Sequence, residues 1–292
     1  MDPITFYIVD VFAEAKYAGN QLAVFRGPVP EALMLPLAQE MHFSETTFIT
    51  SETPRDGGYD VRIFTPGEEV PFAGHPTLGT AHILRTEVAP EPLARVALNL
   101  KVGQIAVRLD EAGTYWMQQQ PPTFGAQLDP AAMAAVLGLD PREIDARFPV
   151  EEVSTGLPFI IVPLRTLGVL QRARVDRDKY FELIAGTWAK GIMVFCPEAR
   201  SAENQLSVRA FVEFYGVPED PATGSGNGCL AGYLVQHRYL GQASVEARVE
   251  QGHQVGRPSL LHLRAGADGD GIRVEVGGQA ITVAKGELQE SV

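Results

Sequence analysis

The chain has 292 residues, of which 45% are hydrophobic and 21% charged, as in an ordinary globular protein of one large or two medium domains. Its net charge of −12 and the lack of a basic run argue against nucleic acid and anionic membranes as partners. The start of the chain lacks a secretion signal and no apolar run reaches membrane-spanning length, so we expect a cytoplasmic protein. Two cysteines, Cys196 and Cys229, form neither a metal-binding spacing nor a disulfide framework.

The first 120 residues read mainly as strands separated by turns. Residues 31–41 instead have the apolar content of a helix, in which Pro36 would have to lie early or cause a kink. The expected strands of this part are 4–12, 21–25, 42–49, 59–64, 96–100, 104–109 and 114–120.

Pro121-Pro122 marks the expected crossing into a second domain. Two helices are expected there, over 130–137 and 177–189, besides a glycine-rich one described below. The expected strands are 148–154, 159–162, 191–196, 208–214, 244–251, 260–263, 271–276 and 280–284. Strands outnumber helices and do not alternate with them as βαβ units, so we expect an α+β fold of antiparallel sheets wrapped around a few helices.

The stretch 213–234 contains the most unusual helix of the sequence. Asp220 and Pro221 are expected to open it, because Asp is a preferred N-cap residue and Pro suits the first helical position. Gly224, Gly228 and Gly232 lie four residues apart within it. Each glycine costs about 1 kcal/mol relative to alanine in a helix. We therefore expect a helix that a sheet encloses closely, or one that presents its first amides to a ligand.

An earlier stretch, 61–84, repeats this arrangement. Three short matches lie 145 to 147 residues apart, close to half the chain: Val61-Arg62-Ile63-Phe64 with Val208-Arg209-Ala210-Phe211, Pro76 with Pro221, and Thr77 with Thr223. We interpret them as a duplication, with chance similarity as the alternative. The expected domains are 1–120 plus 279–292, with a central helix over 76–86, and 121–278, with a central helix over 221–239. If the two helix starts face each other, a small anion is expected between their positive ends.

Glu45 is the sharpest candidate for chemistry. In an alternating strand it shares a face with the apolar residues Phe43 and Ile49. A carboxyl on such a face is expected to have a raised pKa, because burial disfavours its charged form, and this would suit general acid–base catalysis. The alternative is an exposed strand residue, or a register shifted by a bulge.

Three further polar residues lie near the expected helix starts. Asp220 is explained by capping alone, although a capping carboxylate next to a ligand site can serve both purposes. His75 is expected at the position that matches Asp220, where a helix start favours the neutral imidazole; the alternative is a structural histidine. Ser225 is expected on the first turn, where its hydroxyl either contacts an anion or bonds locally.

Several other kinds of site are not expected. The run 224–228 lacks the G-x-G-x-x-G spacing and the βαβ context of a dinucleotide site, so no nucleotide cofactor is expected. His75 and His82 have no third ligand in sequence, so no metal is expected either. Arg62 and Arg209 occupy equivalent places in the repeat and are either surface charges or partners across a site.

With these residues considered, the chain resembles the phenazine-biosynthesis isomerase (PhzF-like) family over essentially its full length. The motifs that carry the resemblance are Val9-Asp10-Val11-Phe12, Gly19-Asn20-Gln21-Leu22-Ala23-Val24-Phe25, Phe43-Ser44-Glu45-Thr46-Thr47-Phe48, Arg62-Ile63-Phe64-Thr65-Pro66, Phe72-Ala73-Gly74-His75-Pro76-Thr77-Leu78-Gly79 and Glu219-Asp220-Pro221-Ala222-Thr223-Gly224-Ser225. The resemblance implies a diaminopimelate-epimerase-like fold of two pseudo-symmetric domains, each a sheet rolled around a central helix, with the active site in the cleft between them. It also implies a homodimer.

The resemblance implies isomerisation of the type performed on trans-2,3-dihydro-3-hydroxyanthranilate, without a cofactor. The acid–base residue maps onto Glu45, which would remove a ring proton and return it elsewhere on the same face. His75 and Asp220 would assist. The residues expected to bind the substrate, through its carboxylate at the helix starts, are Gly74, Pro76, Thr77, Thr223, Gly224 and Ser225.

The related epimerases use two cysteines, but here Gly74 and Asp220 lie near the matching places and Cys229 is too far along its helix. Epimerisation by two thiols is therefore not expected. Two other functions stay open: an epimerase or isomerase of a different small carboxylic acid, and a small-ligand binder without catalysis.

Overall fold

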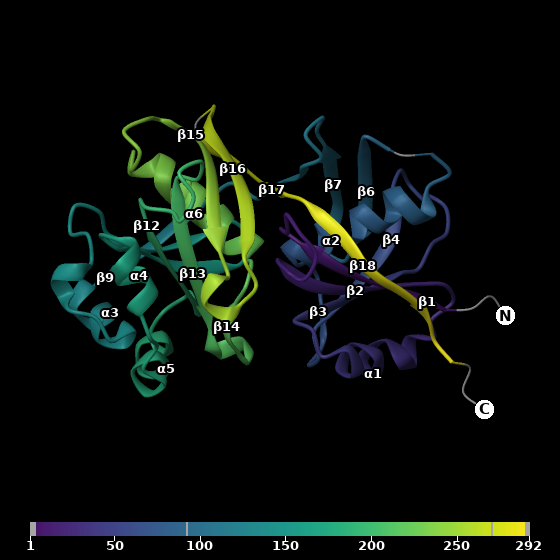
Figure 1. The fold of residues 1–292 in the computed structure, drawn as a ribbon, viewed down its shortest axis with the longest axis horizontal. Helices are drawn as coiled ribbons and strands as arrows, with labels where there is room; N and C mark the ends of the chain where they lie inside the picture. Colours follow the sequence, from purple (N-terminus) through teal and green to yellow (C-terminus); the bar gives the residue numbers. More distant parts are fainter. Residues whose placement is uncertain (1–3, 92, 270, 290–292) are drawn as a thin grey trace. The chain divides into compact units, whose positions relative to one another are not determined.

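The computed structural model describes residues 4–91, 93–269 and 271–289, which form two compact units (Figure 1). Unit 1 comprises Met1–Met117 and Gly277–Val292, and unit 2 comprises Gln118–Val276. Among the described residues, no helix combines the length and the apolar character needed to cross a membrane.

In unit 1, a curved sheet surrounds one helix, α2 (Gly74–Ile83). The strands are β1 (Thr5–Val11), β2 (Asn20–Arg26), β3 (Glu45–Ile49), β4 (Tyr59–Phe64), β5 (Glu69–Val70), β6 (Arg95–Leu100), β7 (Gly103–Leu109), β8 (Tyr115–Gln118) and β18 (Ala280–Glu287). They pair in the order β18, β1, β2, β3, β4, β6, β7, β8, and Figure 1 shows yellow β18 running beside purple β1. Helix α2 contacts β1, β2, β3, β6, β7 and β18, and each of its residues except His82 is buried.

Unit 2 is built in the same way around α6 (Gly224–Gln236). Its strands are β9 (Thr123–Leu128), β10 (Val150–Ser154), β11 (Pro158–Pro163), β12 (Gly191–Cys196), β13 (Leu206–Val212), β14 (Val217–Asp220), β15 (Ser244–Gln251), β16 (Ser259–Asp268) and β17 (Gly271–Gly278). Strands β9, β10, β11, β12, β13, β15 and β16 pair in that order. All residues of α6 except Ser225 and Gln236 are buried.

The strand pairing confirms the duplication. Counted from β1 in unit 1 and from β10 in unit 2, the second and third strands are parallel (β2–β3 and β11–β12), and the fourth strand is parallel to the one that follows the central helix (β4–β6 and β13–β15). In both units a short strand before the helix, β5 or β14, pairs with the fourth strand in the antiparallel direction. The fold is therefore α+β, with two units of the same topology.

The chain forms further helices besides α2 and α6. They are α1 (Glu31–Met41), α3 (Pro130–Leu137), α4 (Leu167–Arg172) and α5 (Arg177–Ala185), with the short helices η1 (Leu84–Val88), η2 (Pro141–Glu143), η3 (Glu213–Tyr215) and η4 (His253–Val255). Met34 and Ala38 of α1 pack on buried Phe25 and Phe48, whose rings stack 5.1 Å apart.

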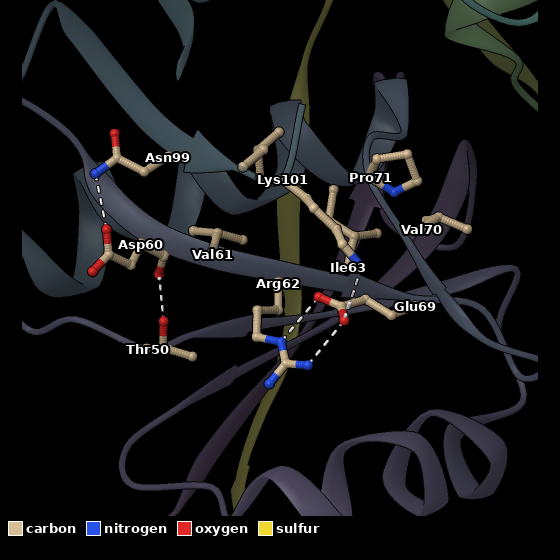
Figure 2. Close-up of a pocket in the computed structure, with 11 residues that line it drawn as sticks. Thr50, Asp60, Val61, Arg62, Ile63, Glu69, Val70, Pro71, Asn99 and Lys101 are labelled. Carbon is tan, nitrogen blue, oxygen red and sulfur yellow. Dashed lines mark hydrogen bonds and ion pairs between the residues drawn. The ribbon is translucent and has the colours of Figure 1, made fainter. Parts of the chain in front are cut away.

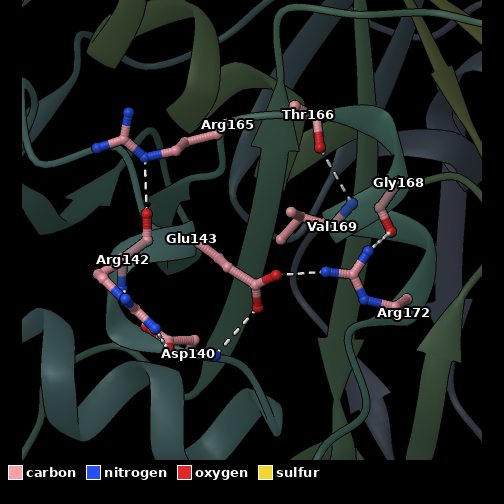
Figure 3. A network of polar contacts seen from close by, with 8 residues as sticks. All are labelled: Asp140, Arg142, Glu143, Arg165, Thr166, Gly168, Val169 and Arg172. Atoms are coloured by element: carbon pink, nitrogen blue, oxygen red, sulfur yellow. Dashed lines mark hydrogen bonds and ion pairs between the residues drawn. The ribbon is translucent and has the colours of Figure 1, made fainter.

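The outer helices of unit 2 share a larger apolar core and a surface polar network. Figure 3 shows Glu143 of η2 paired with Arg172 of α4, and Arg165 donating to the carbonyl of Arg142. Exposed ion pairs of this kind contribute little to stability. The position of α4 therefore depends mainly on Val169 and Leu170, which are buried in the core.

Both central helices begin at other residues than expected. Helix α2 begins at Gly74 rather than 76 and ends at Ile83, while α6 begins at Gly224 rather than 221 and ends at Gln236. Asp220 lies in β14, so the prediction that it caps α6 was wrong. The N-cap residue is Thr223, and its side chain makes no capping hydrogen bond.

The observed helix starts change which residues of the two units correspond to each other. Since Gly74 and Gly224 are both first helical residues, His75 matches Ser225 and not Asp220. Pro221 precedes its helix whereas Pro76 lies within one, so the match between these prolines was coincidental. The sequence prediction also missed β5, β9, β14 and α4, which are short or polar, and α5 ends at Ala185 instead of 189.

Close approach explains the glycines of the central helices. A Cβ atom on Gly79 of α2 would lie 2.6 Å from Leu22 Cδ2 and 2.8 Å from Val11 Cγ2. A Cβ atom on Gly232 of α6 would lie 2.7 Å from the Cβ of Pro122. Real Cβ atoms do not come so near to other carbons, so only glycine lets strands β1 and β2 pack closely on α2 and the segment before β9 pack closely on α6.

We predict that Gly79→Ala lowers the free energy of unfolding by about 1–3 kcal/mol, as other overpacked cores do, although alanine is the better helix former. Gly186→Ala is the matched control, because Gly186 ends α5 with a φ of −95° and a Cβ atom there would meet no other group within 4 Å. Urea unfolding of both variants measures the effect. Equal stabilities of the two variants would contradict the close-approach explanation.

Candidate active site

Glu45 is the first residue of β3, and its side chain projects toward α2. It is registered with Leu22 of β2, whose side chain contacts Gly79 of α2. Registered residues on neighbouring strands project to the same face of a sheet. Two residues further along β3, the hydroxyl of Thr47 lies 2.8 Å from that of Thr80 on α2. The Glu45 side chain is 20% exposed and so is mostly enclosed.

His75, the second residue of α2, lies against Glu45. The distance from His75 Nε2 to Glu45 Oε2 is 3.5 Å, and both atoms are buried. Unit 1 therefore brings together two of the predicted catalytic side chains at the start of its central helix.

The imidazole of His75 is neutral at ordinary pH. Its pKa is lowered to about 3, mainly because burial disfavours the charged form, while a hydrogen bond to the backbone of Gln21 opposes this shift. Nε2 has no hydrogen-bond partner among the described residues, so the bond to Gln21 belongs to the other ring nitrogen, Nδ1. A ring N–H that donates to a backbone carbonyl leaves Nε2 as the acceptor nitrogen. This acceptor is the atom that faces the Glu45 carboxyl.

In unit 2, Asp220 is the last residue of β14 and belongs to a polar network. Its Oδ2 accepts a hydrogen bond of 2.5 Å from the hydroxyl of Thr223, and its backbone carbonyl accepts one of 2.9 Å from Gln251 Nε2. The oxygen Oε1 of Gln251 accepts hydrogen bonds from the Thr223 amide and from Asn227 Nδ2. Gln251 is almost completely buried, and thus fixes both Asp220 and the start of α6.

The start of α6 is suited to bind an anion. Its first intrahelical hydrogen bond runs from the Asn227 amide to the Thr223 carbonyl, so the amides of Gly224, Ser225 and Gly226 precede the hydrogen-bonded turn. Such amides and the helix dipole together favour negative charge.

The start of α2 offers fewer donors. The first intrahelical hydrogen bond there comes from the Thr77 amide, and Pro76 has no N–H, so only Gly74 and His75 present amides. The hydroxyl of Thr77 donates to the carbonyl of Ala73 within the same helix. A carboxylate therefore fits the start of α6 better than that of α2.

The structure places the expected binding residues in two groups. Gly74, Pro76 and Thr77 belong to α2 in unit 1, and Thr223, Gly224 and Ser225 belong to the start of α6 in unit 2. The hydroxyls of Thr77 and Thr223 bond within their own units. Gln251 and Asn227 were not predicted from the sequence. They fix the start of α6 through contacts between distant parts of the chain.

The cysteines lie in surroundings that suppress thiolate chemistry. Burial raises the pKa of both Cys196 and Cys229 to about 11. Cys229 lies within α6, and its thiol donates to the carbonyl of Leu157. Within the described ranges, no three His, Cys, Asp or Glu side chains are grouped so that they could hold a metal ion.

Arg62 and Arg209 pair inside their own units. Figure 2 shows Arg62 against Glu69 in a cavity of about 350 Å³ on unit 1, which contains neither Glu45 nor His75. Arg209 pairs with Glu219 at 2.7 Å in unit 2. Each arginine thus connects the fourth strand of its unit to the short strand before the central helix. These contacts do not support the interpretation that Arg62 and Arg209 are partners across a site.

Two units of the same topology, each with a sheet rolled around a central helix, define the diaminopimelate-epimerase-like fold class. Within this class, the model of the phenazine biosynthesis-like protein family (PhzC-PhzF) matches residues 9–286. The chain belongs to this family, whose curated relatives include isomerases.

Two curated relatives match over nearly their whole length. The trans-2,3-dihydro-3-hydroxyanthranilate isomerase of Pseudomonas fluorescens is 34% identical, with 97% of this chain and 98% of the relative covered. An uncharacterized isomerase of Mesorhizobium japonicum is 32% identical, with 99% of each chain covered.

Solved structures confirm the fold. The phenazine biosynthesis protein of the PhzF family from Bacillus anthracis has a TM-score of 0.88 and 25% identity, covering 99% of this chain and 100% of that one. A probable proline racemase from Agrobacterium radiobacter K84 has a TM-score of 0.63 and 13% identity, covering 99% of this chain and 93% of that one. The latter shares the fold alone.

Histidine burial predicts a pH-dependent stability. Because the folded-state pKa of His75 is about 3 and the ordinary value is 6.5, the unfolded state binds a proton first as the pH falls. The neutral, buried ring of His75 therefore contributes to the free energy of unfolding. This contribution is fully present above pH 6.5 and is lost as the pH falls toward 3. His75→Asn should reduce the slope of unfolding free energy against pH by up to about 1.4 kcal/mol per pH unit in this range.

Urea unfolding between about pH 4 and 7 measures this slope. His42→Asn is the matched control, because His42 is exposed and its left-handed backbone suits asparagine. His82 also has a lowered pKa, of about 4. It contributes equally to the slope of unfolding free energy against pH in both variants. An unchanged slope in His75→Asn would contradict the neutral assignment.

Proposed function

We propose that the protein is a cofactor-independent isomerase that moves a proton between two carbons of a small cyclic amino or hydroxy carboxylic acid. The observation that carries the proposal is the enclosed contact of 3.5 Å between Glu45 and His75. The relative of 34% identity supports a reaction of the trans-2,3-dihydro-3-hydroxyanthranilate isomerase type.

Glu45 acts first as base and then as acid in this mechanism. Its carboxylate takes the proton from the hydroxyl-bearing ring carbon and becomes a carboxylic acid. It then gives the same proton to another carbon on the same face of the ring, which leaves an enol that becomes a ketone. A single carboxyl suffices, because it alternates between its two protonation states.

His75 keeps the transferred proton on Glu45. An imidazole with a pKa of about 3 is a poor proton acceptor, so it does not remove the proton from the carboxylic acid. Its acceptor nitrogen Nε2 can nevertheless receive a hydrogen bond from the protonated carboxyl and orient it. His75 is thus proposed to position the acid form of Glu45 between the two transfers.

The start of α6 in unit 2 is proposed to bind a carboxylate through its three leading amides. Asp220, fixed by Thr223 and Gln251, is proposed to orient an amine or hydroxyl group there. The expected homodimer and cytoplasmic location stay predictions.

We predict that Glu45→Gln lowers kcat/KM for trans-2,3-dihydro-3-hydroxyanthranilate at least about 100-fold, because the amide keeps the shape but cannot accept the proton. Glu40→Gln, a matched change at an exposed position of α1, should keep full activity. Steady-state kinetics and urea unfolding of both variants separate catalysis from stability. More than about 1% residual activity in folded Glu45→Gln would refute the acid–base role.

Hydrogen exchange extends the test to other substrates. In deuterium oxide, the wild-type protein should convert its substrate, before and after dialysis against a chelator, into a ketone that keeps the transferred hydrogen and takes up deuterium only at the carbon that solvent protonates as the enol becomes the ketone. A panel of small cyclic carboxylic acids read by NMR identifies the substrate class, since an uncharacterized isomerase, at 32% identity, is nearly as similar to this chain as the named one at 34%. Saturable binding without exchange on any of them would instead indicate a ligand-binding protein.

A further inference from the structure

Gln119 is a buried amide with an unused donor group close to α6. It lies between Gln118 and Gln120, which are exposed, whereas Gln119 is only 6% exposed. Its backbone amide donates to the carbonyl of Val274, which fixes the main chain. Its side-chain nitrogen Nε2 is buried and has no hydrogen-bond partner among the residues that the structure describes.

The position of this amide follows from the glycine pattern of α6. A Cβ atom on Gly228 would lie 3.0 Å from Gln119 Cγ and 3.3 Å from Gln119 Oε1. It would also lie 2.8 Å from the hydroxyl of Thr155, and that hydroxyl contacts the carbonyl of Ser225 on the first turn. The Gln119 side chain therefore lies against Gly228, one turn into α6, in space that exists because residue 228 has no side chain.

A buried amide nitrogen without a partner is unfavourable in the free protein, because it has lost its hydrogen bonds to water. Such groups occur where a ligand supplies the missing acceptor. A carboxylate is the strongest acceptor among the groups of the proposed substrate, and the leading amides of α6 already favour one. A carboxylate bound there would supply the acceptor that Gln119 Nε2 lacks.

We propose that Gln119 is a substrate-binding residue whose Nε2 donates a hydrogen bond to the carboxylate at the start of α6. This assignment rests on the proposed function, because it places a ring carboxylic acid there. It makes Gln119 a determinant of specificity: ring compounds that lack the carboxylate leave the buried donor unpaired and are bound less tightly.

The test uses Gln119→Met, which keeps the length of the side chain and removes its donor. Gln120→Met is the matched control one residue away. Benzoate, a ring carboxylate that cannot isomerise, serves as the probe, and its Kd is measured calorimetrically on the full chain together with urea unfolding. We expect Gln119→Met to bind benzoate at least about 10-fold more weakly, with an unchanged or higher unfolding midpoint, and Gln120→Met to match the wild type.

A second variant, Gln119→Glu, covers the case in which Gln119→Met does not fold. It brings a carboxylate toward the bound carboxylate, and should abolish benzoate binding through repulsion. An equal Kd in folded Gln119 variants, or no benzoate binding by the wild type, would overturn the assignment. A lower unfolding midpoint of Gln119→Met with unchanged binding would show that a structural water satisfies the amide instead.

Turnover separates this inference from the proposed function. With trans-2,3-dihydro-3-hydroxyanthranilate, Gln119→Met should raise KM at least about 10-fold and change kcat less, as expected for a group that binds without transferring the proton. If benzoate binding depends on Gln119 but the wild type turns over no substrate in the exchange experiment, the proposed function fails and the binding role of Gln119 stands.

Discussion

The structure depends on one constraint: a carboxyl and an imidazole are held 3.5 Å apart where water cannot reach the facing atoms. Burial keeps the imidazole of His75 neutral, so the pair carries no cation that would hold Glu45 permanently ionised. A carboxyl with a neutral acceptor beside it is suited to both protonation states. This is the requirement for moving one proton from carbon to carbon without a second acid or base.

Enclosure of the central helices makes this constraint possible. Glycines such as Gly79 remove the side chains that would keep the sheet away from α2, and the inward residues of β2 and β3 then reach the helix. The same construction in unit 2 yields a different surface, because α6 begins with three amides while Pro76 reduces the donors of α2. The duplicated units have therefore diverged: α2 carries His75 against the enclosed carboxyl of Glu45, and α6 begins with donors that favour an anion.

The sequence predicted those features that depend on local pattern. Strand alternation placed Glu45 on the face of Thr47, and the hydroxyl contact of Thr47 with Thr80 confirms that this face meets α2. Glycine spacing indicated enclosed helices. The predicted N-cap role of Asp220 was wrong, because capping preference is local, whereas Asp220 lies in β14 with its carbonyl bonded to Gln251, and α6 begins only at Gly224. Features that depend on distant contacts were not predictable in this way. Gln119 and its neighbours are the same residue type, and only the approach of Gly228 singles out the middle one.

The most direct test of the central claim is the protonation state of the His75 ring at neutral pH. Nitrogen-15 NMR of labelled protein distinguishes a protonated from an unprotonated ring nitrogen, and His75→Asn assigns the signals. Since the pKa of His75 is about 3, the account predicts a neutral ring at about pH 7, with the proton on Nδ1 and none on Nε2, and no change on lowering the pH to about 5. A ring that carries protons on both nitrogens at neutral pH would contradict it, because the pair would then be an imidazolium and a fixed carboxylate.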